Sequence, residues 1–134
     1  MAGGGAVILL DTCTLLWLTS EPSLLSDRAR ELIQRHRGAL FVSSISAFEI
    51  GQKASRKKLT LPMPNSDWYP SVLRLHGLRE CPIDGEIATR APDLPDLHRD
   101  PFDRILIATA QTHDWKLLTP DPLIHEYPDV EAVW

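Results

Sequence analysis

The residues of this 134-residue sequence that could do chemistry are carboxylates placed just after short apolar segments. Three acids have this placement, namely Asp11, Glu49 and Asp121. Carboxylates that converge repel one another when they are ionised, and hard divalent cations that prefer oxygen ligands remove that cost. The chemistry that such a site favours is phosphodiester hydrolysis, because a bound metal lowers the pKa of a water molecule and stabilises charge on phosphate oxygens.

Two further acids open the segment 105–110, which is apolar on nearly every face. A helix of that kind is buried, so Asp103 lies where solvent is scarce and needs a partner such as a cation. Asp100 followed by Pro101 is typical of a helix N-cap, although Asp100 could also bind metal. The predicted metal ligands are Asp11, Glu49, Asp100 and Asp103. The predicted ion is Mg²⁺, with Mn²⁺ as the alternative, and the predicted catalytic acids are Asp11, Glu49, Asp103 and Asp121.

Each acid also has a purely structural interpretation. Asp11 could cap the helix that starts at the next residue. Ser46 and Glu49 have the spacing of a capping box, and Lys53 lies four residues beyond Glu49, where an ion pair supports a solvated helix. Asp121 stands between two prolines, which is turn chemistry. Asp103 would complete a capping box with Asp100, but two carboxylates are a repulsive way to build one.

Basic side chains are densest after the segment that carries Glu49. The predicted nucleic-acid-binding residues are Lys53, Arg56, Lys57, Lys58 and Arg104. Cations are favoured near a helix C-terminus in any case, so the cluster could equally be a solvated helix end. Arg104 is included because it is adjacent to Asp103, and a guanidinium suits phosphate.

Histidines and cysteines predict no further site. The five histidines have no zinc-binding spacing and are expected at the surface: His36, His76, His98, His113 and His125. Cys13 and Cys81 are expected to be free thiols, which fits a reducing, cytoplasmic setting.

Strands that alternate with helices must position these residues, and this order predicts a parallel sheet covered by helices on both faces. The expected strands are 7–10, 39–42, 78–81, 116–119 and 132–134. The expected helices are 12–19, 27–36, 47–55, 67–75, 84–88 and 101–112. Pro70 interrupts the fourth helix pattern, and Asp84 is expected to be an ordinary cap without acidic companions.

Composition is ordinary for a soluble globular protein, with 43% hydrophobic and 24% charged residues. The length predicts one domain over residues 1–134. A net charge of -4 gives no general attraction to nucleic acid or membrane, so any contact with nucleic acid requires a local basic patch. Residues 1–5 carry no basic residue, and the apolar run after them is too short for a leader or a membrane span.

Four segments carry a resemblance to a known family: 9–17, 42–50, 98–108 and 117–121. In this order and spacing they resemble PIN-domain ribonucleases of the VapC toxin type, over essentially the whole chain. The resemblance implies an α/β/α sandwich around a parallel sheet and Mg²⁺-dependent endonucleolytic cleavage of RNA. It also implies homodimerisation and neutralisation by a small antitoxin. Its four acids match Asp11, Glu49, Asp103 and Asp121, and Asp100 matches an additional acid of a subgroup. Pro120 departs from the polar or basic residue that is common there.

Two other functions are compatible with these residues. Haloacid-dehalogenase-like phosphotransferases also place a nucleophilic aspartate at the end of the first strand, as Asp11 would be. Their second aspartate, two residues later, is Cys13 here. The third reading is a non-catalytic interaction module in which the acids serve only as caps.

Overall fold

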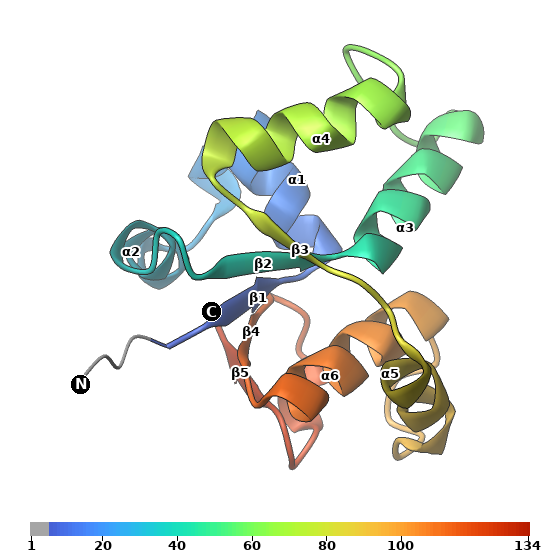
Figure 1. The fold of residues 1–134 in the computed structure, drawn as a ribbon. Helices are drawn as coiled ribbons and strands as arrows, with labels where there is room; N and C mark the ends of the chain where they lie inside the picture. Colours follow the sequence, from blue (N-terminus) through green and yellow to red (C-terminus); the bar gives the residue numbers. More distant parts are fainter. Residues whose placement is uncertain (1–5) are drawn as a thin grey trace.

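A computed structural model describes residues 6–134, and the expectation of no leader in residues 1–5 lies outside it. Its centre is a five-stranded parallel sheet in the order β3-β2-β1-β4-β5 (Figure 1). The strands are β1 (Ile8–Leu10), β2 (Leu40–Ser43), β3 (Arg79–Cys81), β4 (Lys116–Leu118) and β5 (Glu131–Val133). Each predicted strand is therefore present, and each of its ends lies within one residue of the predicted one.

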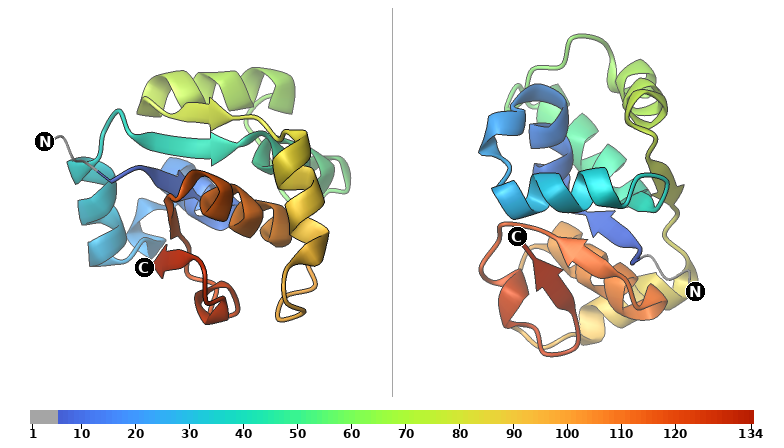
Figure 2. Two further views of the ribbon diagram at one scale, coloured as in Figure 1. Left: turned by 60° about the horizontal axis from the view of Figure 1, so that its bottom comes forward. Right: turned by 90° about the vertical axis from the view of Figure 1, so that its left-hand side faces the viewer.

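Helices lie on both faces of this sheet, as the two further views make clear (Figure 2). They are α1 (Thr12–Ser20), α2 (Asp27–Arg35), α3 (Ser44–Ser55), α4 (Asn65–His76), α5 (Gly85–Arg90) and α6 (Pro101–His113). Helices α1 to α4 share one apolar cluster, whereas α6 packs on the opposite face and α5 packs against α6. The predicted three-layer α/β/α sandwich is confirmed.

The two faces are separated by the alternation of side chains along the central strand. Ile8 and Leu10 belong to the cluster under α1 to α4, and Leu9 belongs to the cluster under α6. All three side chains are fully buried. Alternation is the geometric property of a β-strand, and an all-apolar strand is what a sheet covered on both faces requires.

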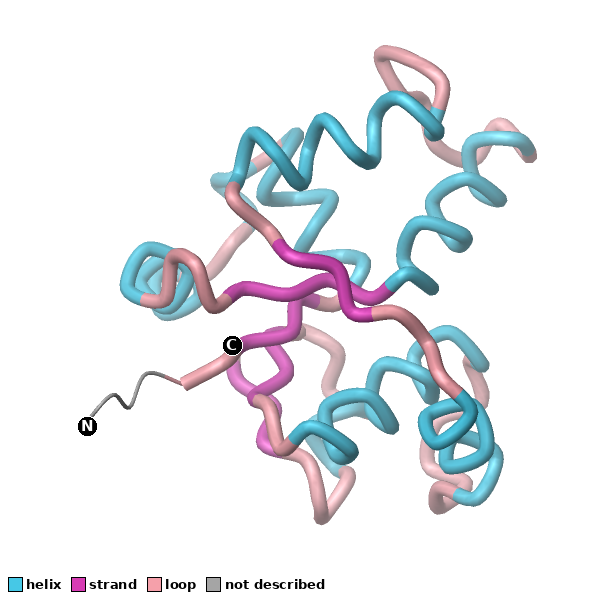
Figure 3. The backbone as a smooth tube through the Cα atoms, in the orientation of Figure 1, coloured by secondary structure: helices cyan, strands magenta, loops and turns pink. Residues whose placement is uncertain are grey.

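The register of the sheet brings three strand ends together. Leu10 of β1 pairs with Val42 of β2 on one side and with Leu118 of β4 on the other. The residues that follow these three strands therefore emerge at one edge of the sheet. Figure 3 shows the loops and helix starts that leave this edge. In open α/β sheets this carboxyl edge is where ligands bind.

Helix α3 begins three residues before its predicted start. Its N-cap is Ser43, whose Oγ accepts a hydrogen bond from Ile45 N at 3.1 Å. Ser46 instead forms a buried hydroxyl–hydroxyl hydrogen bond of 2.8 Å with Thr12. The prediction that Ser46 and Glu49 form a capping box is therefore wrong, because Glu49 lies inside the helix and not in its first turn.

Helix α4 tolerates Pro70 within its second turn and runs on to His76. Trp68 and Val72 on this helix are buried, so the packing of its apolar face outweighs the loss of one backbone hydrogen bond. Both cysteines are free, as predicted. Within residues 6–134 no helix has the length and apolar character needed to cross a membrane.

Candidate active site

Asp11 follows β1 directly and is held by groups from two parts of the chain. Its Oδ1 accepts a hydrogen bond from Thr14 N at 2.7 Å, which makes Asp11 the N-cap of α1, and its Oδ2 accepts one from Thr119 Oγ1 at 2.5 Å. Thr119 follows the neighbouring strand β4. Only 4% of Asp11 is exposed, and burial raises the pKa of its carboxyl above the ordinary value despite these hydrogen bonds. Asp11 is thus both a cap and a buried carboxylate that faces other acids.

Glu49 reaches the same edge from α3. It is 7% exposed, and its Oε2 pairs with Lys53 Nζ at 3.1 Å, which confirms the predicted i,i+4 pair. Its Oε1 is buried and has no hydrogen-bond partner among the described residues. A buried carboxylate oxygen without a partner is costly, and a cation would satisfy it.

Asp100 and Asp103 both belong to the start of α6. Asp100 is the N-cap, since its Oδ1 accepts from Phe102 N at 2.9 Å. Asp100 N–H donates to His98 Nδ1 at 3.2 Å, so the second half of a capping box is absent here and that interpretation of Asp103 is wrong. Asp103 Oδ2 lies 3.1 Å from His98 Nε2. Burial, followed by the charge of Asp100, raises the pKa of the Asp103 carboxyl to about 7.

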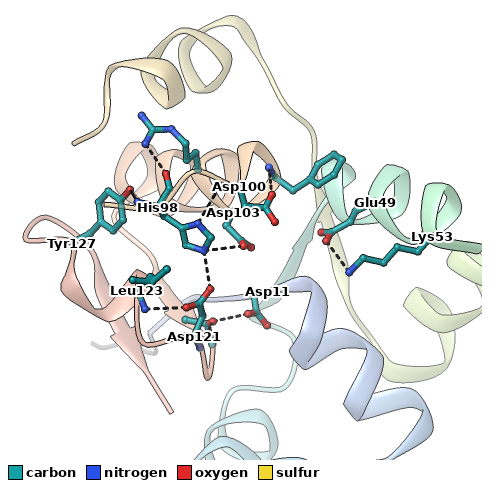
Figure 4. Close-up of polar contacts among 12 residues, drawn as sticks. Asp11, Glu49, Lys53, His98, Asp100, Asp103, Asp121, Leu123 and Tyr127 are labelled. Carbon is teal, nitrogen blue, oxygen red and sulfur yellow. Dashed lines mark hydrogen bonds and ion pairs between the residues drawn. The ribbon is translucent and has the colours of Figure 1, made fainter. Parts of the chain in front are cut away.

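Asp121 closes the site from the segment after β4. Its Oδ1 accepts a hydrogen bond from Leu123 N at 2.9 Å, which confirms the predicted turn. Its Oδ2 lies 2.8 Å from His98 Nε2 (Figure 4). The structure therefore adds a residue that the sequence prediction placed at the surface. His98 is only 8% exposed, and its position two residues before Asp100 was the one sequence signal for its role.

One pocket of about 360 Å³ gathers all five acids, and we call it the acidic pocket. Its lining includes Asp11, Glu49, Asp100, Asp103, Asp121 and Lys53. Figure 4 shows these side chains converging from different elements of the fold. Lys53 is the only cation among the described residues that line it, so the five carboxylates exceed the positive charge within the lining. The predicted acids thus lie together as expected.

A second pocket of about 510 Å³ continues from the first and is called the basic pocket. Its lining includes Gln52, Lys53, Arg56, Lys58, Arg99 and Phe102. It shares Glu49, Lys53 and Asp100 with the acidic pocket. Three predicted RNA-binding residues thus line it, and Arg99 is an addition that sequence reasoning missed. Lys57 lines a different pocket, near the loop 59–64.

Arg104 has a different position from the one predicted. Its guanidinium donates to four carbonyl oxygens of the loop before α6, those of Pro92, Leu94, Pro95 and His98, at 2.8 to 3.3 Å. With its donors used in this way, Arg104 fixes the loop and does not line either pocket. The prediction that Arg104 contacts phosphate is therefore wrong for these two pockets.

The donor set of the acidic pocket fits a hard divalent cation. It consists mainly of carboxylate oxygens, which Mg²⁺ and Mn²⁺ prefer, and it contains the unpartnered Oε1 of Glu49. Ligand atoms of His98, Asp103 and Asp121 also lie within 4.8 Å of one another. A cation in this pocket would relieve both the excess negative charge and the unsatisfied oxygen.

Comparison with known proteins assigns a family to this chain, with its parallel five-stranded sheet and its acidic pocket. The family model described as PIN domain matches residues 8–130, and the chain belongs to this family. Ribonuclease VapC22 of Mycobacterium tuberculosis (strain ATCC 25618 / H37Rv) is 33% identical over 130 residues, which cover 95% of this chain and 98% of the relative. Membership of the PIN family excludes the haloacid-dehalogenase alternative.

Solved structures share this fold at lower sequence identity. DNA-bound VapBC from Salmonella typhimurium has a TM-score of 0.71 at 14% identity and covers 96% of this chain and 98% of that one. FitAcB from Neisseria gonorrhoeae has a TM-score of 0.67 at 20% identity, with coverages of 96% and 97%. A toxin–antitoxin complex from Klebsiella pneumoniae has a TM-score of 0.66 at 22% identity, with coverages of 95% and 96%.

Proposed function

We propose that this chain is a Mg²⁺-dependent endoribonuclease and the toxin of a toxin–antitoxin pair. The observation that carries the proposal is the convergence of five acids in one pocket, where Glu49 keeps a buried oxygen without a partner. The 33% identity to a protein named ribonuclease VapC22 supports RNA as the substrate. The single sheet that spans the described residues supports the proposal that residues 1–134 act as one domain.

Asp11, Glu49 and Asp103 would hold the metal, with Asp100 beside them and Asp121 supporting the site. When bound, a divalent cation at such oxygens lowers the pKa of water and stabilises negative charge on a phosphate, and Mn²⁺ is expected to substitute for Mg²⁺. Thr14 and Thr119 fix the direction of the Asp11 carboxylate through the two hydrogen bonds described above. Orientation of this kind keeps the acidic oxygens in place before substrate arrives.

The basic pocket is the proposed path of the RNA backbone. Lys53, Arg56, Lys58 and Arg99 offer positive charge along a surface that adjoins the acids. Arg56 and Lys58 are exposed, so they can contact phosphates without first breaking a buried interaction. Because backbone contacts carry no sequence information, these residues are expected to set affinity and salt dependence, while target selection depends on other contacts. Lys57 lines a different pocket, and we propose it as a peripheral contact of the RNA.

Partner proteins are proposed from the solved relatives. Two of the similar structures are described as VapBC from Salmonella typhimurium and a toxin–antitoxin complex from Klebsiella pneumoniae. These support a small cognate antitoxin as the partner of this chain, and we further propose that the chain forms a homodimer. Two free thiols fit a cytoplasmic setting, where they would stay reduced.

The test is cleavage of a mixture of folded RNAs by the purified chain, with Mg²⁺ present and after chelation. We expect cleavage only with the metal, and we expect Glu49→Gln to abolish it. Glu31→Gln is the matched control, because Glu31 pairs with Arg35 at 3.2 Å in the same i,i+4 arrangement but is exposed on α2. Cleavage that persists in chelator would contradict metal dependence. A chain that binds neither Mg²⁺ nor Mn²⁺ and cleaves no RNA would instead be a non-catalytic interaction module.

A further inference from the structure

The imidazole of His98 is held in one orientation by a backbone contact. Asp100 N–H donates to His98 Nδ1 at 3.2 Å, so Nδ1 uses its lone pair and carries no proton. In a neutral ring the proton then resides on Nε2. That nitrogen lies 2.8 Å from Asp121 Oδ2 and 3.1 Å from Asp103 Oδ2. The ring therefore presents one N–H group to two carboxylates at once.

The backbone of His98 is fixed as firmly as its side chain. Its N–H donates to Tyr127 Oη at 2.9 Å, and Tyr127 Oη–H donates to Pro95 O at 2.9 Å. Its carbonyl oxygen accepts from Arg104 at 2.9 Å. Tyr127 is buried, so this anchor lies in the core and not on a mobile surface. Together with the contact at Nδ1, these contacts restrain the ring, so Nε2 is the nitrogen that faces the carboxylates.

The same geometry weighs against His98 as a metal ligand. Coordination through Nε2 needs a lone pair on that atom, which would move the ring proton to Nδ1. A proton on Nδ1 would point at Asp100 N–H, so two donors would face each other. The ring of His98 is thus oriented to donate a hydrogen bond through Nε2. This holds although its ligand atom lies within 4.8 Å of those of Asp103 and Asp121.

We propose that His98 is a positioning residue that joins Asp103 of α6 to Asp121 of the segment after β4. The shared N–H holds one oxygen of each carboxylate and directs Asp103 Oδ1 into the acidic pocket. These acids come from positions 18 residues apart in the chain, as the numbers 103 and 121 give. Without the bridge, like charges at this distance would repel one another and the pocket would widen. The inference rests on the proposed metal site.

Two substitutions separate the contacts that His98 makes. His98→Gln keeps an N–H donor near the position of Nε2 but cannot accept from Asp100 N–H. His98→Asn keeps an acceptor near the position of Nδ1 but is too short to reach the two carboxylates. His36→Gln, after α2 and away from the pocket, is the control. Mn²⁺ is the probe, and its Kd is measured by calorimetry on the full chain, with thermal unfolding as the test of folding.

We expect His98→Asn to weaken Mn²⁺ binding by about 10- to 100-fold, which is the usual cost of losing a group that orients a metal ligand. His98→Gln should recover most of that loss, and the kcat for RNA should follow the same order with KM less affected. The reverse order, in which Asn binds Mn²⁺ normally and Gln does not, would show that His98 serves only the loop and would overturn the proposal.

Spin-echo spectroscopy of bound Mn²⁺ gives an independent reading. We expect no nitrogen coupling of the strength that a directly coordinated imidazole gives. Such a coupling in the native chain, absent in His98→Asn, would make His98 a ligand and overturn the positioning role. A native chain that cleaves no RNA but binds Mn²⁺ more tightly than His98→Asn would support the positioning role while contradicting the ribonuclease.

Discussion

The junctions β1–α1 and β3–α5 have the same local design and different surroundings. In each an aspartate after a strand caps the next helix, with Thr14 N–Asp11 Oδ1 at 2.7 Å and Ile87 N–Asp84 Oδ1 at 2.9 Å. Asp84 is exposed and follows β3 at the edge of the sheet, whereas Asp11 is buried between strands on both sides. Capping is complete at Asp84 although this side chain is exposed and lies outside the acidic pocket. Helix capping therefore does not explain why Asp11 is buried and lies beside other acids.

Substituting each of the two aspartates separately gives the largest expected difference in RNA cleavage. Asp11→Asn should lower RNA cleavage by more than about 100-fold, beyond the usual cost of losing a group that only orients a metal ligand. Asp84→Asn should leave cleavage near the native rate, because it changes a cap of the same geometry outside the acidic pocket. Single-turnover assays on folded variants measure this. Equal losses in both variants would reduce Asp11 to a structural cap.

Metal-dependent stabilisation should separate the two junctions next. A ligand that binds only the folded chain stabilises it by about 2.7 kcal/mol at 100 times its Kd. Native protein and Asp84→Asn should therefore gain melting temperature as Mg²⁺ is added, and Asp11→Asn should gain much less. Thermal unfolding at a series of Mg²⁺ concentrations checks this, with Ca²⁺-free buffer and matched ionic strength. An undiminished gain in Asp11→Asn would remove Asp11 from the metal site.

Asp103 gives a pH-dependent comparison. Burial holds the pKa of its carboxyl at about 7 in the folded chain, whereas in the unfolded chain it is near the ordinary value of about 4. Between these pH values the unfolded chain loses this proton and the folded chain keeps it. The contribution of Asp103 to stability is therefore fully present below pH 4 and is lost as the pH rises to 7.

Asp103→Asn removes this penalty and keeps an oxygen that can accept from His98. In metal-free protein we expect its melting temperature to exceed the native one by several degrees at pH 8, and the two to converge at pH 4. Asp84→Asn should show no such convergence. A difference between Asp103→Asn and the native chain that stays constant from pH 4 to 8 would contradict the raised pKa.

The smallest expected effect concerns the cap itself. Asp84→Ala should cost about 1 kcal/mol of unfolding free energy, the usual cost of removing an N-cap side chain. RNA cleavage should be unchanged, since Asp84 does not line the acidic pocket. Denaturant unfolding measures the loss. A cost near zero would mean that the cap of α5 contributes nothing, and the two junctions would no longer be comparable.

The fold was largely predictable because its strands are short apolar runs that end in polar residues. Continuous apolar runs located β1, β2 and β4 well, and the predicted start of the second helix at residue 27 is confirmed, because Ser26 is the N-cap of α2. The start of α3 was missed because serines occur at 43, 44 and 46, and each is a suitable cap. The choice of Ser43 depends on Ser46 bonding to Thr12, which is 34 residues away in the chain.

The acids of the site were predictable, but their connections were not. His98 binds acids on two sides, and one of them lies 23 residues later, so no local pattern reveals the contact. The predicted phosphate contact of Arg104 is wrong because residues adjacent in sequence need not face the same way in space. Successive residues on an α-helix point about 100° apart, so Arg104 faces the loop while Asp103 faces the pocket.

The four carbonyl contacts of Arg104 have a consequence for the segment 92–98. This segment has prolines at 92 and 95, and it would pass for a loose linker. One guanidinium satisfies its carbonyl oxygens in place of a helix or strand partner. The segment should therefore resist proteolytic nicking as well as a regular element does. A lysine at 104 would keep the charge but could not reproduce the planar fork of donors, and proteases should then cut there first.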